Sequence, residues 1–479
     1  MWQINRNSNV PLYLQIVDMI EQKISYGVFS PGSKLPSERK LAELLGVHRS
    51  TISLAYLELR SKGIVDTLRG KGTLVNIPNK NKNKILIHPP QWEGYLEKGN
   101  LHPNLPLLRV IRESILNNPT LIDFASGKLS EDLVPINKIN EIMHQYNYNA
   151  NFGYDFPNGY LPLRMALVNF LKEYRNIHTT EESILITTGT QQSLFLIAQS
   201  LLSPGDAIAV ENPSFLLSLP MFKSLGLKLY RIPTDKQGII PEEIRSLYRK
   251  HKIKMLFVNP NYQNPTGCLL NQQRKDALIK IAAEIGIPIV EDDSLSLATF
   301  EKQIPSSLKT NDQIANIIHI GSFSKIAAAG LRIGWIVAPF PVIKRLADAR
   351  RQMDLGFNII PQHIAAEYMK SDYFSLHLTK LRKELLNKRN ITIRALQAEM
   401  NDYVKFTIPH GGLHLWCKIS PKINDRQLLQ NSINNGVIYV PGSVYGSENG
   451  YMRLTFARPH ENEITQAITK LAISLKPLL

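Results

Sequence analysis

Short apolar runs alternate with helical segments from about residue 121 onward, and this alternation limits the possible folds more than any other feature. The runs are four residues long and span 184–187, 207–210, 255–258, 287–290 and 317–320. Strands that are apolar throughout indicate a sheet covered on both faces, and helical connections make such strands parallel. We therefore predict an α/β fold built on a mostly parallel sheet for this part of the chain.

The chain has 479 residues, which is more than one hydrophobic core usually supports, so a second domain is expected. A repetitive polar stretch at 77–84 cannot pack a core and separates an N-terminal unit from the rest. Prolines at 89, 90, 103 and 106 follow it and stiffen the chain. We predict a small domain at 1–75, a linker at 76–118 and a large domain at 119–479.

The N-terminal unit carries the start and stop signals of two short helices. Ser37 is a typical N-cap for a helix at 38–45, and Gly46 ends that helix. A second helix is expected at 48–62. Two short helices joined by a tight glycine turn form a helix-turn-helix.

A hairpin with a basic tip is expected next, because two apolar segments flank Arg69-Gly-Lys71-Gly. A hairpin in this place indicates the wing of a winged helix. The second helix begins with basic and polar residues, so we expect Arg49 and Thr51 in the major groove of DNA. Arg69 and Lys71 are expected on phosphates or in the minor groove.

Charge alone leaves open whether this unit binds DNA or is a small interaction domain with a solvated basic face. Residues 1–80 carry 11 Lys and Arg against six Asp and Glu, in a chain of net charge +16. The order of residues favours DNA, because the segments beginning at Leu35, Leu45 and Gly70 together resemble the DNA-binding domain of the GntR family. The resemblance implies a double-stranded DNA operator as partner. The predicted DNA-binding residues are Arg39, His48, Arg49, Ser50, Thr51, Arg69, Lys71 and Gly72.

In the large domain, the segment from Ser322 to Arg332 holds one amine, two hydroxyls and one guanidinium within eleven residues. The Lys325 amine can form a Schiff base with an aldehyde, while Ser322, Ser324 and Arg332 can hydrogen-bond a phosphate. Lys325 is therefore the predicted catalytic residue and the attachment point of a phosphate-bearing aldehyde cofactor.

Other loops offer the remaining groups that such a cofactor needs. Thr190 and Gln191 follow a strand and open a helix, whose N-terminal N–H groups can hold a phosphate. Asp292 ends an apolar strand and can keep a pyridine nitrogen protonated. Together these residues predict a second phosphate contact and a partner for the pyridine nitrogen.

Three further side chains complete the predicted site. Asn264, in an Asn-Pro-Thr-Gly turn, can donate to a ring oxygen, and Phe215 can stack on the ring face. Arg453 offers a planar fork for a carboxylate of the effector. Each residue alone is weak evidence, because such turns, caps and arginines are common without a ligand.

In sequence order, these residues resemble the fold-type I, pyridoxal-phosphate-dependent aminotransferases over about residues 120–475. Tyr154 and Gly159 match a segment that reaches the phosphate of the neighbouring subunit in that family. Joined to the GntR-like unit, the whole resembles the MocR subfamily of bacterial transcription regulators over about nine tenths of the chain. The resemblance implies a homodimer, pyridoxal 5′-phosphate as cofactor, a small C-terminal α/β subdomain and a pocket that senses an amino acid or amine, often with little or no turnover.

One departure from the subfamily concerns the residues after Asp292. The subfamily usually has a tyrosine two or three positions later, whereas this chain has Ser294 and Leu295. The ring hydroxyl of the cofactor then loses a donor, which Ser294 or Asn264 would partly replace. The departure weakens the alternative of a catalytically active aminotransferase with an accessory DNA-binding domain. A third alternative is a scaffold without cofactor.

Composition supports an intracellular protein without a metal site. The only cysteines, Cys268 and Cys417, have no Cys-x-x-Cys spacing and no histidine cluster, which argues against structural zinc and for a reducing compartment. No run of about 18 apolar residues occurs, and the first residues lack the apolar core of a signal peptide. We therefore expect a cytoplasmic protein that does not bind a membrane.

Overall fold

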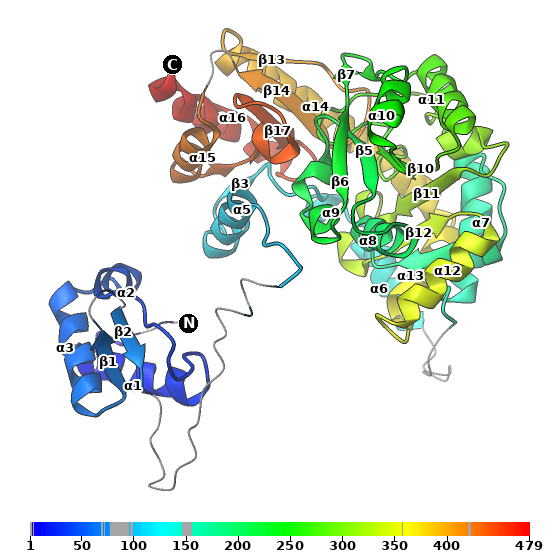
Figure 1. Ribbon diagram of the computed structural model, residues 1–479. Helices are drawn as coiled ribbons and strands as arrows, with labels where there is room; N and C mark the ends of the chain where they lie inside the picture. Colours follow the sequence, from blue (N-terminus) through cyan, green and yellow to red (C-terminus); the bar gives the residue numbers. More distant parts are fainter. Residues whose placement is uncertain are drawn as a thin grey trace, which may run out of the picture. The chain divides into compact units, whose positions relative to one another are not determined.

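The chain divides into two compact units, Met1–Gly99 and Asn100–Leu479, and each is described by itself (Figure 1). The computed structural model describes residues 2, 4–68, 70, 72–76, 95, 99–145, 156–356, 358–419 and 423–479. The predicted site residues Arg69, Lys71 and Tyr154 lie outside the described residues.

Unit 1 has the predicted helix-turn-helix and wing. It consists of α1 (Leu12–Ser25), α2 (Glu38–Leu45), α3 (Arg49–Ser61), β1 (Val65–Leu68) and β2 (Gly72–Val75). Ser37 caps α2 by accepting a hydrogen bond from the Lys40 amide at 3.3 Å, and Gly46 ends it with φ 60°. The two strands pair antiparallel as a hairpin. Ile16, Ile20, Ile52 and Leu59 are fully buried, so the three helices share one small core.

Unit 2 is built on a seven-stranded sheet of order β4-β12-β11-β10-β9-β5-β6. The strands are β4 (Ile184–Thr187), β5 (Ala207–Glu211), β6 (Lys228–Ile232), β9 (Met255–Val258), β10 (Ile289–Asp292), β11 (Ile317–Ser322) and β12 (Gly334–Val337). Six of the seven strands run in the same direction, and β12 runs opposite to them. The sheet is mixed and mostly parallel, which confirms the predicted fold class.

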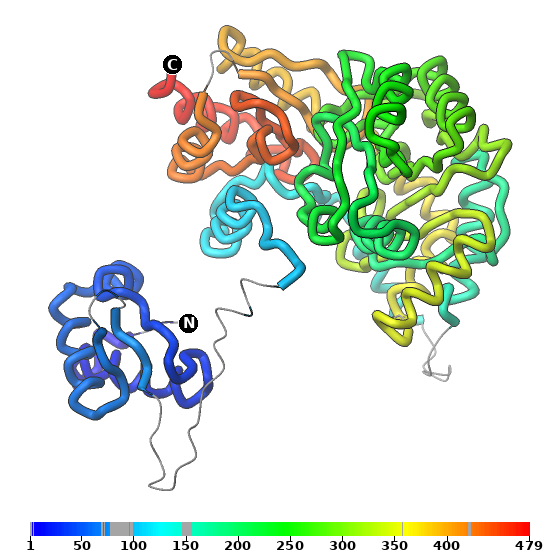
Figure 2. Tube along the Cα trace, in the orientation of Figure 1, coloured from blue at the N-terminus to red at the C-terminus, as the bar shows by residue number. Residues whose placement is uncertain are grey.

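Helices cover both faces of the sheet, as the path of the chain in Figure 2 shows. Alternate residues of β9 point to opposite sides: Met255 and Phe257 join the core beneath α8 and α12, whereas Leu256 and Val258 join the core beneath α11. The covering helices are α7 (Leu161–Arg175), α8 (Thr190–Leu201), α11 (Gln272–Ile285), α12 (Phe340–Arg351) and α13 (Ile359–Lys370). Burial on both faces explains why these strands are apolar throughout.

The C-terminal part forms a smaller antiparallel sheet of order β13-β14-β17-β16. Its strands are β13 (Val404–Phe406), β14 (His414–Ile419), β16 (Val440–Pro441) and β17 (Tyr451–Thr455). Its helices are α14 (Tyr373–Met400), α15 (Asp425–Asn434) and α16 (Glu461–Leu475). The shorter elements of unit 2 are β3 (Ile122–Asp123), α6 (Ile136–Gln145), α9 (Met221–Ser224), β7 (Thr234–Asp235), β8 (Gly238–Ile239), α10 (Glu243–His251) and β15 (Val437–Ile438).

A helix, α5 (Pro106–Asn117), occupies the end of the segment predicted as a linker. It belongs to unit 2, and its residue Ile111 is 4% exposed. The prolines suggested a stiff linker. Pro106, however, stands at the first helical position, where an N–H group would have no acceptor within the helix, so proline loses no hydrogen bond there. Residues 100–118 are therefore part of the large unit rather than linker.

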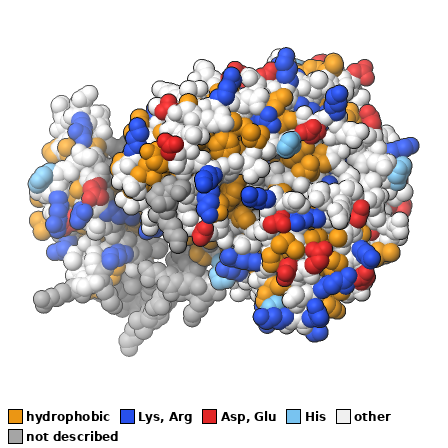
Figure 3. Space-filling model, turned by 90° about the horizontal axis from the view of Figure 1, so that it is seen from above, with side chains coloured by type: hydrophobic (Ala, Val, Ile, Leu, Met, Phe, Trp, Pro, Cys, Tyr) orange, Lys and Arg blue, Asp and Glu red, His pale blue; other side chains and the backbone are white. Residues whose placement is uncertain are grey.

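The surface of unit 2 mixes its charges. On the face drawn in Figure 3, Lys and Arg side chains lie among Asp, Glu and hydrophobic side chains over much of the unit. Among the described helices, none combines the length and the low polarity that crossing a bilayer demands.

Replacing Ile52 with Ala should destabilise unit 1 by about 2–5 kcal/mol, because the buried side chain leaves a cavity behind. Leu54 lies on the same helix but is 46% exposed, so Leu54→Ala is the matched control, with an effect below about 0.5 kcal/mol. Hydrogen–deuterium exchange of peptides from α2 and α3 measures this unit within the full chain. Equal exchange rates in the two variants would contradict the core described here.

Candidate functional site

The candidate site lies at the edge of the large sheet where β10 and β11 end. The two strands are parallel, with Asp292 opposite Ile320, so their carboxyl ends meet at one edge. Lys325 follows β11 directly, at the end of a short 3-10 turn, Phe323–Lys325. The strand pairing thus brings Asp292 and Lys325 to one place, although 33 positions separate them in the sequence.

The Lys325 amine is partly buried and donates a hydrogen bond to the carbonyl oxygen of Gly127. Burial lowers the pKa of Lys325 to about 8, and the positive charge of Arg453 acts in the same direction, while Asp292 opposes it. A larger fraction of the amine is therefore neutral near pH 7 than in an ordinary lysine. A neutral amine is the form that can attack an aldehyde.

Asp292 faces the same cavity, and the hydroxyl of Ser294 donates a hydrogen bond to its Oδ1. The Ser294 amide donates to the same oxygen at 3.3 Å. Burial raises the pKa of Asp292. The Ser294 hydroxyl proton is engaged in the hydrogen bond to Asp292. It therefore orients the Asp292 carboxylate and is not available to a ring hydroxyl.

Arg453 is 4% exposed and is held by neutral acceptors. Its Nη1 donates to Asn264 Oδ1 at 3.1 Å and its Nη2 donates to the Ala125 carbonyl oxygen. Its Nε is buried and has no hydrogen-bond partner among the described residues. Burial lowers the pKa of Arg453, and the guanidinium lies 5.1 Å from the ring centre of Tyr445. A buried cation whose hydrogen-bond acceptors are all neutral among the described residues is suited to bind an anionic ligand.

The opposite end of the site is the N-terminus of α8. Thr190 and Gln191 are its first two residues, and Gly189 precedes them with φ 108°. Arg332 lies over this helix start: its Nη2 donates to the Thr188 carbonyl oxygen at 2.8 Å, and a Cβ on Gly189 would lie 2.9 Å from that nitrogen. The free N–H groups of a helix start beside a guanidinium form an anion site.

A cavity of about 330 Å³ connects these groups. Seven of the predicted residues line it: Thr190, Gln191, Phe215, Asn264, Asp292, Lys325 and Arg453. Phe215 is fixed by its amide, which donates to the Asn264 carbonyl oxygen at 2.9 Å. Ser322 and Ser324 are not among the lining residues. The Ser322 hydroxyl accepts from the Ser324 amide at 3.2 Å and lies 3.4 Å from the Ile333 carbonyl oxygen, so it orders the turn before Lys325.

Helix α5 supplies one wall of the cavity that the sequence analysis missed. Leu108, Ile111, Arg112 and Ile115 line it, at positions i, i+3, i+4 and i+7, which share one face of the helix. That periodicity is visible in the sequence, but the neighbouring prolines led to the linker interpretation.

These residues fit pyridoxal 5′-phosphate. The cavity offers an amine, a carboxylate, an aromatic ring and a helix start, and Arg332 lies over that helix start although it is not among the lining residues. Among the described residues only Oδ1 of the Asn264 side chain has a hydrogen-bond partner, so the amide nitrogen can donate to a ligand. The unpartnered Nε of Arg453 leaves one further donor for a ligand anion.

Four of the predicted DNA-contacting residues, His48 to Thr51, lie at the start of α3. Arg49 is the first residue of α3 and its Nε donates to Glu38 Oε2 at 3.1 Å, while 70% of its side chain stays exposed. His48 Nδ1 lies 2.8 Å from the Ser50 hydroxyl. Arg39 is exposed on α2, Thr51 follows on α3, and Gly72 begins β2. The start of α3 therefore presents polar and basic groups to solvent.

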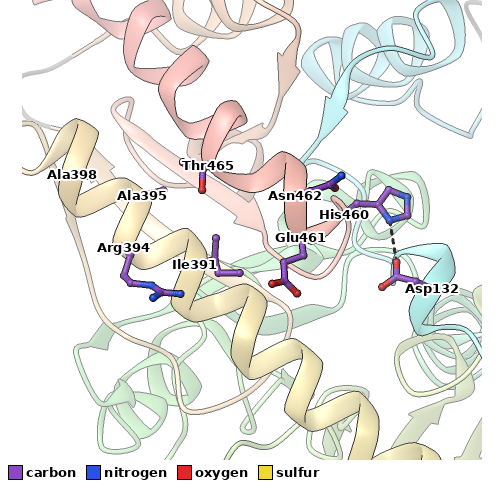
Figure 4. A pocket seen from close by; sticks show the side chains of 9 residues that line it. All are labelled: Asp132, Ile391, Arg394, Ala395, Ala398, His460, Glu461, Asn462 and Thr465. Carbon is purple, nitrogen blue, oxygen red and sulfur yellow. Dashed lines mark ion pairs between the residues drawn. The ribbon is translucent and has the colours of Figure 1, made fainter.

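A second depression, of about 810 Å³, lies between α14 and α16 and is drawn in Figure 4. Its lining includes the ion pair between His460 Nδ1 and Asp132 Oδ1 at 3.2 Å. Glu461 accepts from the Asn387 amide at 2.8 Å. None of the residues lining this depression was predicted as a site residue. Three of its charged or titratable side chains, Asp132, His460 and Glu461, already have partners, so the depression is not included in the candidate site.

Two family models together match most of the chain. The model for aminotransferase class I and II matches residues 119–471, and the model for bacterial regulatory proteins of the GntR family matches residues 12–75. Among relatives, the uncharacterized HTH-type transcriptional regulator YdfD of Bacillus subtilis is 36% identical over 98% of this chain and 97% of its own length. The HTH-type transcriptional regulator NorG of Staphylococcus aureus is 30% identical over 92% of this chain and 99% of its own length.

Solved structures match the large unit. A kynurenine aminotransferase from Pyrococcus horikoshii aligns with a TM-score of 0.75 at 29% identity, covering 81% of this chain and 98% of that one. An archaeal alanine:glyoxylate aminotransferase aligns with a TM-score of 0.77 at 29% identity, covering 81% of this chain and all of that one.

Glu211, at the end of β5, is a buried carboxyl behind the site. It is 3% exposed and accepts hydrogen bonds from the Asn259 amide at 3.1 Å and from Gln263 Nε2 at 3.3 Å. Burial raises the pKa of Glu211 to about 8, against these two hydrogen bonds. The carboxyl is therefore largely protonated in the folded protein at neutral pH.

The raised pKa predicts a loss of stability with rising pH. The folded protein holds this proton more tightly than the unfolded chain, so the stabilisation is complete below about pH 4.5 and is lost as pH rises to about 8. Glu211→Gln should flatten this dependence, whereas the same change at the exposed Glu182 should leave it unaltered. Melting temperatures of wild type, Glu211→Gln and Glu182→Gln from pH 5 to 8 measure this pH dependence of stability. Parallel curves for wild type and Glu211→Gln would contradict the assignment.

Proposed function

For this chain, which belongs to the MocR subfamily of GntR-type transcription regulators, we propose a large domain that holds pyridoxal 5′-phosphate on Lys325 and senses an amino acid or amine. The protein is an HTH-type transcriptional regulator with an aminotransferase-like domain. The observation that carries the finer proposal is the meeting of Lys325, Asp292 and Arg453 in one cavity beside the start of α8.

Each part of the cofactor has a proposed partner in the cavity. Thr190, Gln191 and Arg332 hold the phosphate, Asp292 binds the pyridine nitrogen, and the Asn264 amide donates to the ring oxygen while Phe215 covers one ring face. When bound, the cofactor supplies an aldehyde carbon that an amine can attack. In a homodimer, Tyr154 would reach the phosphate of the neighbouring subunit, as the family resemblance implies.

Arg453 selects a ligand with a carboxylate. Its guanidinium is buried, and the acceptors that it has among the described residues are neutral, so an added carboxylate would supply the charged hydrogen-bond partner. The ligand's own amine competes with Lys325 for the aldehyde carbon. We propose an amino acid as effector, with the amine directed toward Lys325 and the carboxylate toward Arg453.

Helix α5 is the proposed link between ligand and DNA. It lines the cavity with Leu108, Ile111, Arg112 and Ile115, and in the sequence it is the first helix of unit 2 after the segment that joins the two units. A ligand that contacts this face favours one position of α5 over another. It can shift the equilibrium between the two by no more than its difference in affinity for them.

A second candidate function is transamination. It is favoured by the likeness to two aminotransferases of solved structure at 29% identity and by the presence of Lys325, Asp292 and Arg453. Ser294 and Leu295, in place of the usual tyrosine, count against efficient turnover. A transaminase would form product repeatedly from an amino acid and a 2-oxo acid, with a turnover number of roughly 1–10³ s⁻¹, as is common for enzymes.

Purified protein mixed with pyridoxal 5′-phosphate should show a visible absorption band that Lys325→Ala lacks, because Lys325 supplies the amine of the cavity that bonds to the aldehyde. Screening amino acids and polyamines should find an amine that shifts the band without releasing product.

Arg453→Lys should weaken the binding of an amino acid effector at least about tenfold, since it removes a bidentate contact with a carboxylate.

Amines without a carboxylate serve as the control, because Arg453→Lys should leave their binding nearly unchanged. The same band in Lys325→Ala as in wild type would refute the cofactor assignment. Product formed over many turnovers would support the transaminase instead of the sensor.

Replacing Arg49 with Ala should weaken sequence-specific DNA binding while leaving the visible band intact, because the start of α3 is the proposed base-contacting surface and the cavity lies in unit 2. The loss of one bidentate base contact costs about 1–3 kcal/mol, or roughly 5- to 150-fold in affinity. Lys62→Ala, beyond the last turn of the same helix, is the matched control and should bind the operator as wild type does. Unchanged operator affinity in Arg49→Ala would refute the assignment of α3.

A further inference from the structure

Arg112 is a cation in the wall of the site cavity whose charge none of the roles above uses. It lies on α5, its side chain is exposed, and it lines the cavity together with Lys325 and Arg453. Its guanidinium has no hydrogen-bond, ion-pair or ring partner among the described residues. All five of its N–H donors are therefore available to a ligand.

Helix α5 turns one cation and several apolar side chains toward the cavity. Arg109, the other arginine of the helix, is exposed but does not line the cavity, and the same is true of Glu113. The apolar lining residues of the helix are Leu108, Ile111 and Ile115. An apolar wall that carries a single cation suits a ligand side chain with an apolar stem and an anionic end.

The charges of the cavity argue for a second anion on the ligand. Three cations line the cavity, whereas Asp292 is the one carboxylate among its described lining residues and is already proposed to bind the pyridine nitrogen. His414, buried next to Gly127 and Lys325, adds no positive charge, because burial lowers its pKa well below the ordinary value. A cationic ligand side chain would therefore find no unassigned carboxylate in the lining, and a neutral one would leave Arg112 without a charged partner.

Building on the function proposed above, we propose that Arg112 selects an amino acid with a second carboxylate at the end of its side chain. Arg453 binds the α-carboxylate, the amine is directed toward Lys325, and Arg112 binds the distal carboxylate while the apolar residues of α5 contact the stem. Arg112 is thus a specificity-determining residue. Its contact with the ligand acts on α5 directly, so an acidic ligand favours the position of α5 in which the contact forms.

The test compares each acidic amino acid with its own side-chain amide, in full-length protein loaded with pyridoxal 5′-phosphate. The pairs are aspartate and asparagine, glutamate and glutamine, and 2-aminoadipate and its amide. Titration of the visible band gives the dissociation constant of each amino acid. Both members of a pair share the amine, the α-carboxylate and the length, so their ratio isolates the charge at the end of the side chain.

Wild type should bind the acid at least about fivefold more tightly than the amide in one pair or more, as expected for a charge-assisted hydrogen bond at a partly exposed site. Arg112→Gln should remove this preference by weakening the acid and not the amide. Arg112→Glu should reverse it and favour lysine or ornithine.

Arg109→Gln is the matched control, because it removes an exposed arginine of the same helix that does not line the cavity. This variant should keep the wild-type preference. Arg112 is itself exposed, so its replacement should leave the fold intact. General damage to the site would weaken both members of a pair and leave their ratio unchanged.

A second measurement needs no cofactor. Isothermal titration calorimetry of the protein without added cofactor compares glutarate with pentanoate and adipate with hexanoate, which have equal numbers of carbon atoms. At least one of the two dicarboxylates should bind more tightly than its partner, and Arg112→Gln should remove the difference.

Equal affinities for acid and amide in every pair would overturn the inference, as would a preference that Arg112→Gln retains. A wild-type protein without a visible band would refute the proposed function instead. The calorimetric comparison then decides on Arg112, because equal binding of dicarboxylates and monocarboxylates would overturn its role.

Discussion

The burial of positive charge at one sheet edge is the constraint on which the site depends. Lys325 and Arg453 line one cavity, where Asp292 is the carboxylate that offsets the charge of Lys325 and Asp123 the one that offsets the charge of Arg453. Burial makes each cation costly, which lowers both pKa values and leaves the Lys325 amine more often neutral. The same excess of positive charge favours anionic groups as ligands. A reactive amine and a preference for phosphate and carboxylate therefore have one physical cause.

The sheet holds this arrangement by a buried polar network on the other side of β10. Side chains alternate along a strand, so Glu291 and Asp293 point away from the cavity that Asp292 faces. Glu291 Oε2 lies 3.1 Å from His319 Nδ1, its partner in the register of β11, and Asp293 forms a buried ion pair with Arg175. Breaking a buried pair by removing one partner typically costs about 3–5 kcal/mol. The network thus fixes the end of β10, and with it the position of Asp292 relative to the strand that leads to Lys325.

The sequence predicted those features that depend on local chemistry. Ser37 and Gly46 bound a helix because a hydroxyl and a glycine satisfy helix ends wherever the helix lies. The apolar strand segments likewise required burial on both faces, and their parallel order followed from the helices between them. The meeting of Lys325 with Asp292 was expected only because the order of motifs resembled a known family.

The features that the sequence did not reveal depend on neighbours far away in the chain. Nothing in its sequence neighbourhood distinguishes His414, and only the fold brings it next to Gly127 and Lys325. The contact of the Ser322 hydroxyl with the Ile333 carbonyl oxygen, at 3.4 Å, likewise depends on how the chain returns to pair with β11. For α5 the local signals were ambiguous, because a proline is equally at home in a stiff linker and at the first position of a helix.

The weak attachment of α5 makes it the element of the cavity wall that a ligand can move at the lowest cost. Within α5 only Ile111 is buried, whereas α7, of similar length, buries seven residues. Elements with few buried apolar side chains open and shift at lower free energy than the core. A ligand of modest affinity can therefore bias the position of α5, although it cannot alter the sheet that carries Lys325 and Asp292. Under the proposed function, a rigid site joined to a weakly held wall would separate recognition of an effector from the movement that reports it.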